Sequence, residues 1–167
     1  TEDELYESAM LRLNEIMRMG TGAVEIKSGY GLSTESELKM LRVIKRLKEN
    51  SPLTIKANFL GAHGIPMEYR GHQEEYVDLV INEMMPLVAT ENLADFVDVF
   101  CDKGFFTVED TERILMAGIK YGMRPKIHAN EMAVSGGGQV GVQYGAISGG
   151  HLAQRGMEAI EALIGAE

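Results

Sequence analysis

The residues most capable of chemistry are histidines, and His128 has the most informative neighbours. Asn130 and Glu131 follow it closely, so an imidazole, an amide and a carboxylate lie within one short segment. Such a group suits a metal site with a proton shuttle, because neutral imidazole binds metal ions and a carboxylate can accept a proton. His63 and His151 are further candidates, although His63 taken alone could equally be a core residue whose ring bonds a backbone carbonyl.

Other polar residues have alternative structural interpretations. Tyr30, in a Ser-Gly-Tyr-Gly turn, could simply pack over a sheet, and Asp102 could cap a turn. Lys27 interrupts an apolar run and is either paired with an acid in the interior or part of a site. The run Gly136–Gly138 could hold an anion at a helix N-terminus, but without a following Lys-Ser/Thr it favours a close-packed turn. His72 opens a polar helix and is expected to be solvated.

These candidates follow a regular alternation of predicted helices and strands. Amphipathic or capped segments predict helices over 2–19, 34–50, 72–88, 107–121, 135–144 and 157–164. Short apolar runs predict strands over 23–28, 53–60, 96–101, 126–129 and 146–151. Thr34 with Glu37, and Thr107 with Asp110, have the spacing of capping boxes. A helix followed by strand–helix units is typical of a parallel sheet with helical crossovers.

The ends of the predicted strands favour one of two folds. A doubly wound sheet and a (β/α) barrel both fit the order of elements. A polar residue lies at or just after the C-terminal end of each predicted strand: Tyr30, His63, Asp102, His128 with Glu131, and His151. Catalytic groups collect at that edge in both folds, but only a barrel makes the strand ends converge on one pocket. We therefore expect an α/β fold, namely a partial TIM-type (β/α) barrel of about five βα units. Residues 1–167 would form a single incomplete domain.

The composition argues against several other classes of protein. With 167 residues, 45% of them hydrophobic, the chain can form one domain with a substantial core. A net charge of −9 without a basic stripe argues against nucleic acid as a partner, and no apolar run is long enough for a membrane span. The acidic N-terminus does not resemble a signal peptide, and the single cysteine, Cys101, allows no intrachain disulfide, so we expect a cytoplasmic protein.

Five segments together resemble imidazolonepropionases, a family of the amidohydrolase superfamily. The segments are Val24–Leu32, Phe59–His63, Asp98–Cys101, Lys126–Glu131 and Gly145–Leu152. They occur in the family's order and at about its spacing, and together they cover essentially the whole chain. Several motifs in register make this resemblance far more specific than any single motif.

The resemblance implies a hydrolase of histidine breakdown that opens the ring of 4-imidazolone-5-propanoate with water, giving N-formimidoyl-L-glutamate. It implies a barrel of the metal-dependent hydrolase fold with one Zn or Fe ion as cofactor. His128 would be a metal ligand, Glu131 would contact the substrate and help activate the attacking water, and His151 would assist proton transfer. Tyr30 and His63 would bind the small-molecule substrate.

The chain departs from the family pattern in two ways. Family members have a His-x-His pair on the first barrel strand and an Asp on the last, whereas this chain has no His-x-His and its last aspartate is Asp110. The family also has Asp directly before the equivalent of His151 and Glu two places after it. This chain has Gly150 and Ala153 at those positions.

The departures leave two alternatives open: another amidohydrolase, such as a deaminase or a hydantoinase-like enzyme, or a non-catalytic truncated α/β domain. About five parallel strands cannot close a barrel of eight. We therefore expect two free strand edges and an apolar inner face without an opposite wall. The isolated chain should self-associate or pair with the missing barrel segments, bind Zn²⁺ weakly and be inactive.

Overall fold

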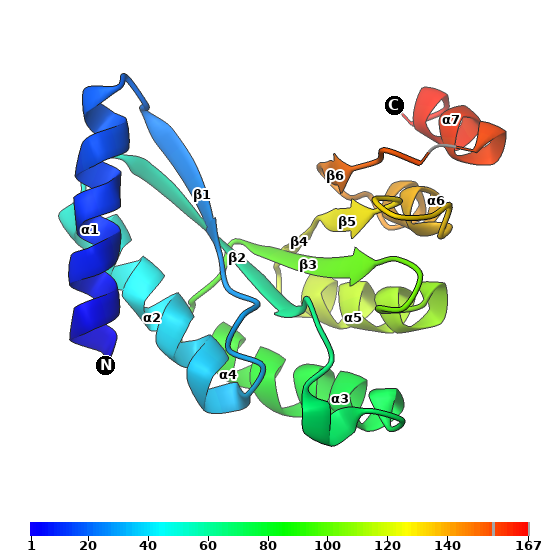
Figure 1. Cartoon of the computed structure of the whole chain (residues 1–167), viewed down its shortest axis with the longest axis horizontal. Helices are drawn as coiled ribbons and strands as arrows, with labels where there is room; N and C mark the ends of the chain where they lie inside the picture. The colour runs from blue at the N-terminus through cyan, green and yellow to red at the C-terminus, as the bar shows by residue number, and fades with distance from the viewer. Residues whose placement is uncertain (155, 167) are drawn as a thin grey trace.

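The computed structural model describes residues 1–154 and 156–166, which form a curled parallel sheet with helices along its outer face (Figure 1). The strands are β1 (Ala23–Lys27), β2 (Thr54–Ala62), β3 (Phe96–Cys101), β4 (Arg124–Pro125), β5 (Ile127–Ala129) and β6 (Gly149–His151). Their order is β1-β2-β3-β5-β6, with β4 paired to β3, and every pairing is parallel. The expected α/β half-barrel is therefore confirmed.

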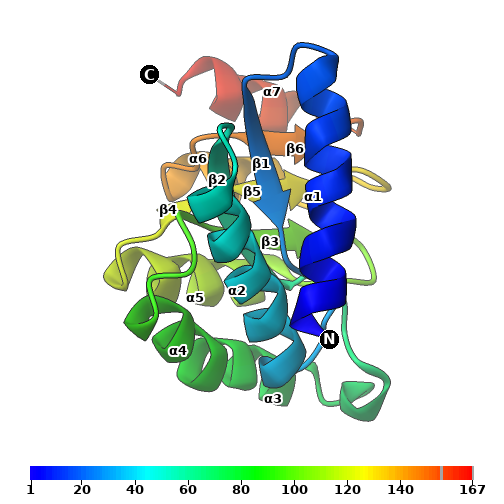
Figure 2. The ribbon, with the colours of Figure 1, turned by 90° about the vertical axis from the view of Figure 1, so that its left-hand side faces the viewer.

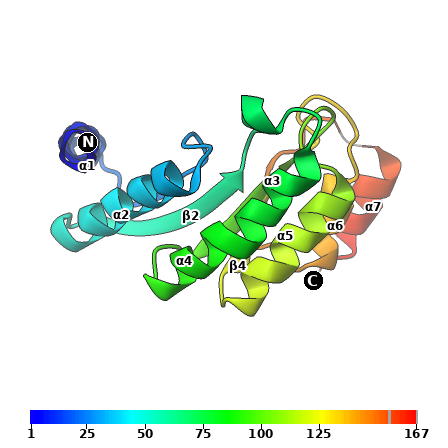
Figure 3. The ribbon, with the colours of Figure 1, turned by 90° about the horizontal axis from the view of Figure 1, so that it is seen from below.

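The helices follow the strands in the expected alternation. They are α1 (Glu2–Arg18), α2 (Thr34–Asn50), the 3-10 turn η1 (Met67–Tyr69), α3 (Gln73–Leu79), the π-helical η2 (Val80–Met84), α4 (Met85–Thr90), α5 (Val108–Lys120), α6 (Gly137–Gln143) and α7 (Met157–Ile164). Figure 2 shows α1 beside α2, and Figure 3 shows the later helices following one another along one side of the sheet. Among the described residues, no helix has the length and apolar character needed to cross a membrane.

Two of the elements that differ from their predicted form do so for identifiable local reasons. The helix expected over 72–88 contains the π-helical turn η2 just before Pro86. Proline has no N–H and its ring crowds the preceding turn, which accounts for the wider turn at that point. The strand expected from Ala146 begins only at Gly149, because the Ala146 N–H donates to the Gly141 carbonyl and closes the end of α6.

The outer face of the sheet forms the hydrophobic core. Side chains alternate along a strand, so every second residue points towards the helices. These outward residues are apolar and buried: Ile55, Ala57 and Phe59 on β2, and Val97 and Val99 on β3. The glycine run before α6 is a close-packed turn, as predicted. A Cβ on Gly137 would lie 2.6 Å from the Cβ of Ala129, so only glycine permits this approach of α6 to β5.

The inner face carries many charged groups, so the expectation of an apolar interior is wrong. Lys27 pairs with Glu25 on the same strand, and its Nζ lies 3.4 Å from Asp98 Oδ2 on β3. Glu25 also accepts hydrogen bonds from Lys126 and from Asn58 Nδ2, the latter at 2.9 Å. Lys27 is therefore one member of a paired interior network. The contact between Glu25 on β1 and Lys126 beside β5 spans two intervening strands, which the concave curl of the sheet makes possible.

Candidate active site

Five aromatic or imidazole rings form a continuous line across the C-terminal ends of the strands. Tyr30, after β1, contacts His63, after β2, with ring centroids 4.7 Å apart. Phe100 on β3 lies 5.9 Å from His63 and 6.4 Å from His151 on β6. The His151 ring is 5.4 Å from that of His128 on β5. The structure thus brings the predicted strand-end residues together, and Phe100, which was not predicted, joins the two halves of the line.

His128 is oriented by Asp98 on the neighbouring strand. His128 Nδ1 lies 2.9 Å from Asp98 Oδ1, and the Asp98 side chain is fully buried. Asp98 Oδ2 in turn accepts a hydrogen bond from Asn58 Nδ2 at 2.8 Å. In a neutral imidazole, donation of the Nδ1 proton to a carboxylate leaves Nε2 as the free nitrogen, and this pairing is the one that orients histidine ligands in metal sites.

The described residues fit one part of a metal site. His128 offers Nε2 as a ligand and has the supporting carboxylate that such ligands use. Within 1–154 and 156–166, no group of three or more His, Cys, Asp or Glu is placed to hold a metal ion. Zinc sites in proteins have three or four protein ligands. A complete site would therefore need ligands beyond those that the described residues supply.

His151 reaches the site because its backbone is left-handed, with φ 64°. In the β5–β6 register, Gly150 lies opposite His128 and His151 lies opposite Ala129. An extended His151 would therefore point to the side on which Ala129 is buried. Instead, its Nε2 lies 3.4 Å from Glu131 Oε2. Left-handed residues other than glycine are uncommon and cluster at functional sites, which agrees with a role for His151.

Gly150 and Ala153, the two positions beside His151 that differ from the family pattern, lie in different surroundings. A Cβ on Gly150 would lie 3.2 Å from His128 Cδ2, tighter than ordinary contact. Glycine at this position therefore leaves space against the His128 ring. Ala153 is exposed and lies beyond the end of β6.

Tyr30 lies on a turn whose backbone amides are bound by the Glu37 side chain. This glutamate is fully buried, and its carboxylate accepts the N–H groups of Gly29, Gly31 and Leu32 at 2.9, 2.7 and 3.1 Å. A buried carboxylate requires such donors, because burying an unpaired charge is very costly. The turn is thereby fixed, while Tyr30 itself is 79% exposed and available to a ligand.

The role of Glu37 overturns the predicted capping box at the start of α2. The N-cap is Ser33, whose hydroxyl accepts the Ser36 N–H at 3.3 Å, and Thr34 is already in the helix. Glu37 is turned away from the helix end towards the Tyr30 turn. The second predicted box is confirmed, since Thr107 and Asp110 make both reciprocal hydrogen bonds at the start of α5.

His63 makes the backbone contact expected of a core histidine and also lies in the line of rings. Its Nδ1 lies 3.2 Å from the Gly29 carbonyl, as for a structural histidine, while its ring contacts Tyr30 and Phe100 in the site. His72, by contrast, is exposed and pairs with Glu75 at 3.2 Å, apart from the line of rings.

Sequence reasoning missed the carboxylates that hold the site residues. Asp98 and Glu25 enter the sequence analysis only as members of family-like segments, and the amide Asn58 is not among its candidates. An aspartate in the middle of the otherwise apolar run Phe96–Cys101 is a signal that could have identified Asp98, as Lys27 was noted in its own strand. Buried charges are rare unless they are paired. A lysine and an aspartate that both lie within apolar strands are therefore candidates for an ion pair with each other.

The half-barrel has a relative among solved structures, the crystal structure of a Xaa-Pro dipeptidase with bound methionine in the active site. The similarity has a TM-score of 0.55 at 17% identity and covers 86% of this chain and 40% of that chain. At this level of identity the similarity establishes the fold alone. No protein-family model matches the sequence.

Curated imidazolonepropionases are similar to the chain over its whole length. That of Flavobacterium johnsoniae is 55% identical over 100% of this chain, and that of Christiangramia forsetii is 53% identical over 99%. That of Clostridium tetani is 47% identical over 98%. The chain spans 39–41% of the length of these three relatives. The resemblance seen in the motifs is therefore confirmed: the chain matches about two fifths of an imidazolonepropionase.

Proposed function

We propose that a complete barrel containing this chain hydrolyses 4-imidazolone-5-propanoate to N-formimidoyl-L-glutamate in histidine breakdown. The observation that carries the proposal is the convergence of His128, His151 and Glu131 with Tyr30 and His63 at one edge of the sheet. The substrate class comes from the similarity of this chain to imidazolonepropionases, of which it spans 40–41%. The five residues take the roles that the resemblance implied.

Glu131 and His151 would move the protons of the reaction. Their carboxylate and imidazole are 3.4 Å apart, close enough to act on the same water molecule. The water oxygen bonds to the ring carbonyl carbon as the adjacent ring C–N bond breaks. Glu131 accepts one water proton, and the nitrogen that leaves receives a proton from the Glu131–His151 pair. Ring opening gives one product, which carries the new carboxylate and an N-formimidoyl group.

His128 would be one ligand of a Zn or Fe ion. When bound, such an ion lowers the pKa of water and polarises a carbonyl group. Asp98 keeps His128 in the tautomer that presents Nε2, and Asn58 holds Asp98. The fixed ring needs no rearrangement on binding, which favours affinity.

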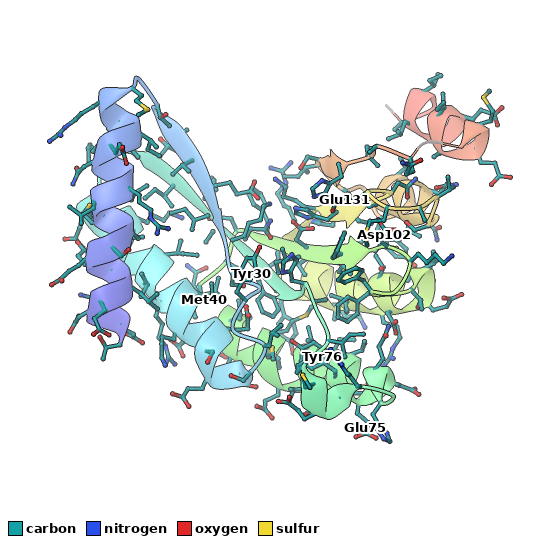
Figure 4. All side chains as sticks on the ribbon, in the orientation of Figure 1. Tyr30, Met40, Glu75, Tyr76, Asp102 and Glu131 are labelled. Carbon is teal, nitrogen blue, oxygen red and sulfur yellow. The ribbon has the colours of Figure 1, made fainter. Side chains whose placement is uncertain are left out.

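Tyr30 and His63 would bind the substrate. Their rings meet edge to face, with an interplanar angle of 67°. Tyr30 and Glu131 are labelled in Figure 4. The buried Glu37 keeps the Tyr30 turn in place without taking part in contact with the substrate. The pair thus offers a small heterocycle a preformed surface made of two ring planes set at a steep angle.

The test uses a hybrid protein: the Flavobacterium johnsoniae relative with its matching segment replaced by residues 1–167. After purification with Zn²⁺ or Fe²⁺, it should convert imidazolonepropionate at a rate comparable to that of its parent, with N-formimidoyl-glutamate identified by mass spectrometry. A folded, metal-loaded hybrid that opens a hydantoin or deaminates a heterocycle, but leaves imidazolonepropionate intact, would reject the proposed substrate.

The 167-residue chain alone should self-associate, bind Zn²⁺ weakly and show no hydrolysis. Among the described residues β1 pairs only with β2 and β6 only with β5, so each leaves an edge able to pair with another copy. Exposed apolar side chains, among them Met67 and Ile164, add to this tendency. Light scattering, zinc titration and a turnover assay of the isolated chain would check it. A monomer with tight stoichiometric zinc and full turnover would contradict the incomplete-site interpretation.

The stability of the hybrid should fall in acid through Glu25. Burial opposes ionisation of Glu25, but hydrogen bonds from Lys126, Lys27 and Asn58 outweigh it and lower its pKa from 4.5 to about 2. Because the folded pKa is the lower one, this stabilisation is complete above about pH 4.5 and is lost as the pH falls towards 2. Glu25→Gln should therefore be less stable than the parent at neutral pH, and the difference should shrink towards pH 2.

Urea unfolding of the hybrid at several pH values would measure this difference. The matched control is Glu49→Gln, which changes an exposed glutamate at the end of α2 that has no ion pair among the described residues. A Glu25→Gln difference that stays constant with pH would mean that the ion pairs do not stabilise the fold.

A further inference from the structure

Asp102 holds the loop that carries Glu131, although the two residues follow different strands. Asp102 directly follows β3, and Glu131 lies just after β5 (Figure 4). One carboxylate oxygen of Asp102 accepts the N–H groups of Glu131 and Met132 at 2.7 and 2.9 Å. The other accepts those of Ala133 at 3.2 Å and Lys103 at 2.7 Å. A single side chain therefore fixes three consecutive amides of the neighbouring loop.

The chemistry of this contact requires a carboxylate. Asp102 is 4% exposed, and all four donors around it are backbone N–H groups. Burial disfavours its charge, but the four amide hydrogen bonds outweigh burial and hold the pKa of Asp102 below its ordinary value. An amide in place of the carboxylate would present an NH₂ group to N–H donors and lose part of these hydrogen bonds.

A second set of contacts ties the same loop to the end of β3. The Ser135 hydroxyl donates to the Cys101 carbonyl at 2.8 Å and lies 2.8 Å from Asn130 Oδ1. Asn130 is fully buried and left-handed, with φ 53°. The loop is therefore pinned at both ends, and Glu131 leaves it at a fixed point facing His151. Asp102 provides the contacts nearest to Glu131.

We propose that Asp102 is the positioning residue of Glu131, setting where its carboxylate lies for proton transfer. This inference rests on the proposed function, because the reaction gives Glu131 its task. Asp102 does not touch the substrate: it acts through the main chain of residues 131–133. Its loss should reduce kcat more than it changes KM, because substrate contacts from Tyr30 and His63 remain. A displacement of about 1 Å at a reacting group can cost about 100-fold in rate.

The experiment compares Asp102→Asn with Asp95→Asn in the hybrid protein. Asp95 precedes β3 at its opposite end and likewise accepts a backbone N–H, from Ala57 at 2.9 Å, so it is a matched control remote from the site. We expect kcat to fall by about 10- to 100-fold in Asp102→Asn, with metal content unchanged, and to stay near the parent value in Asp95→Asn. Asp102→Glu, which keeps the carboxylate, should recover part of the lost rate.

Amide hydrogen exchange provides a readout that does not depend on turnover. In the unsubstituted hybrid, the amides of Glu131, Met132 and Ala133 should be protected although they lie in a loop, and Asp102→Asn should remove that protection. If the hybrid has no hydrolase activity but shows this pattern, the proposed function fails while the loop anchor stands. Unprotected amides in the unsubstituted hybrid would overturn the inference, as would a folded Asp102→Asn variant with the parent kcat.

Discussion

In the hybrid protein, His128→Ala should abolish metal retention and, with it, hydrolysis of imidazolonepropionate. The family resemblance makes His128 the proposed metal ligand, and its imidazole is held by the buried Asp98. Loss of an outer-shell partner alone typically costs about 10- to 100-fold in metal affinity or activity, so loss of the ligand itself should cost more. Metal content by mass spectrometry and turnover should be measured on the same preparation.

Two further variants make this result interpretable. His72→Ala removes an exposed imidazole whose one ion pair among the described residues is with Glu75, so it should leave metal content and rate unchanged. Asp98→Asn keeps the shape of the side chain but weakens its hold on His128, and should lie between the parent and His128→Ala in metal affinity. A His128→Ala hybrid that retains one metal ion and full turnover would remove His128 from the ligand set.

The strand-end geometry of the site was predictable because it depends on local patterns. Short apolar runs bounded by glycine and proline predicted the strands, and alternation with helices predicted parallel pairing. In any such sheet, residues after the strands share one edge. The positions of His63, His128 and Glu131 follow from these rules without knowledge of packing. The choice of a barrel over a flat sheet rested on the assumption that these groups converge, and the line of ring contacts agrees with it.

The conformations of Glu37 and His151 could not be derived in the same way. The Thr34–Glu37 spacing is a sound local signal for a capping box, yet three unpaired amides of the Tyr30 turn compete for the same carboxylate. Because Glu37 is buried, its carboxylate binds the amides of the Tyr30 turn and not the N-terminus of α2. For His151, strand alternation predicts the wrong side of the sheet, and only its left-handed backbone places the ring beside Glu131.

The charged inner face was mispredicted because its pairs are distant in sequence. Glu25 and Lys126 are 101 residues apart, and Asn58 and Asp98 are 40 apart. In the sequence, each of these residues is a single polar residue within an apolar strand. Its position does not indicate which distant residue it pairs with. For this reason the sequence predicted an apolar inner face. The structure shows a polar network whose charged members pair with one another and which supports His128 through Asp98.

Glu131→Gln in the hybrid should retain metal and lose most of the rate. The substitution keeps the shape of the side chain and leaves the Asp102 contacts to the main chain intact, but it removes the proton acceptor. General acid–base groups typically contribute about 10²–10⁴-fold, so kcat should fall by that factor. Glu49→Gln, at an exposed site, is the matched control. Full activity in Glu131→Gln would refute the assigned role.

The partner of Glu131 allows a sharper test of the same role. If Glu131 and His151 pass protons as one unit, the double variant Glu131→Gln/His151→Ala should be little slower than Glu131→Gln alone, since residues that act as a unit are strongly non-additive. Their 3.4 Å separation makes such coupling feasible. Multiplicative losses in kcat would instead assign them separate tasks, with Glu131 acting on the water and His151 elsewhere. In the family, carboxylates flank the equivalent of His151, whereas this chain has Gly150 and Ala153 at those positions. Among the described residues, the carboxylate beside His151 is that of Glu131. Strong coupling between Glu131 and His151 is therefore the expected outcome.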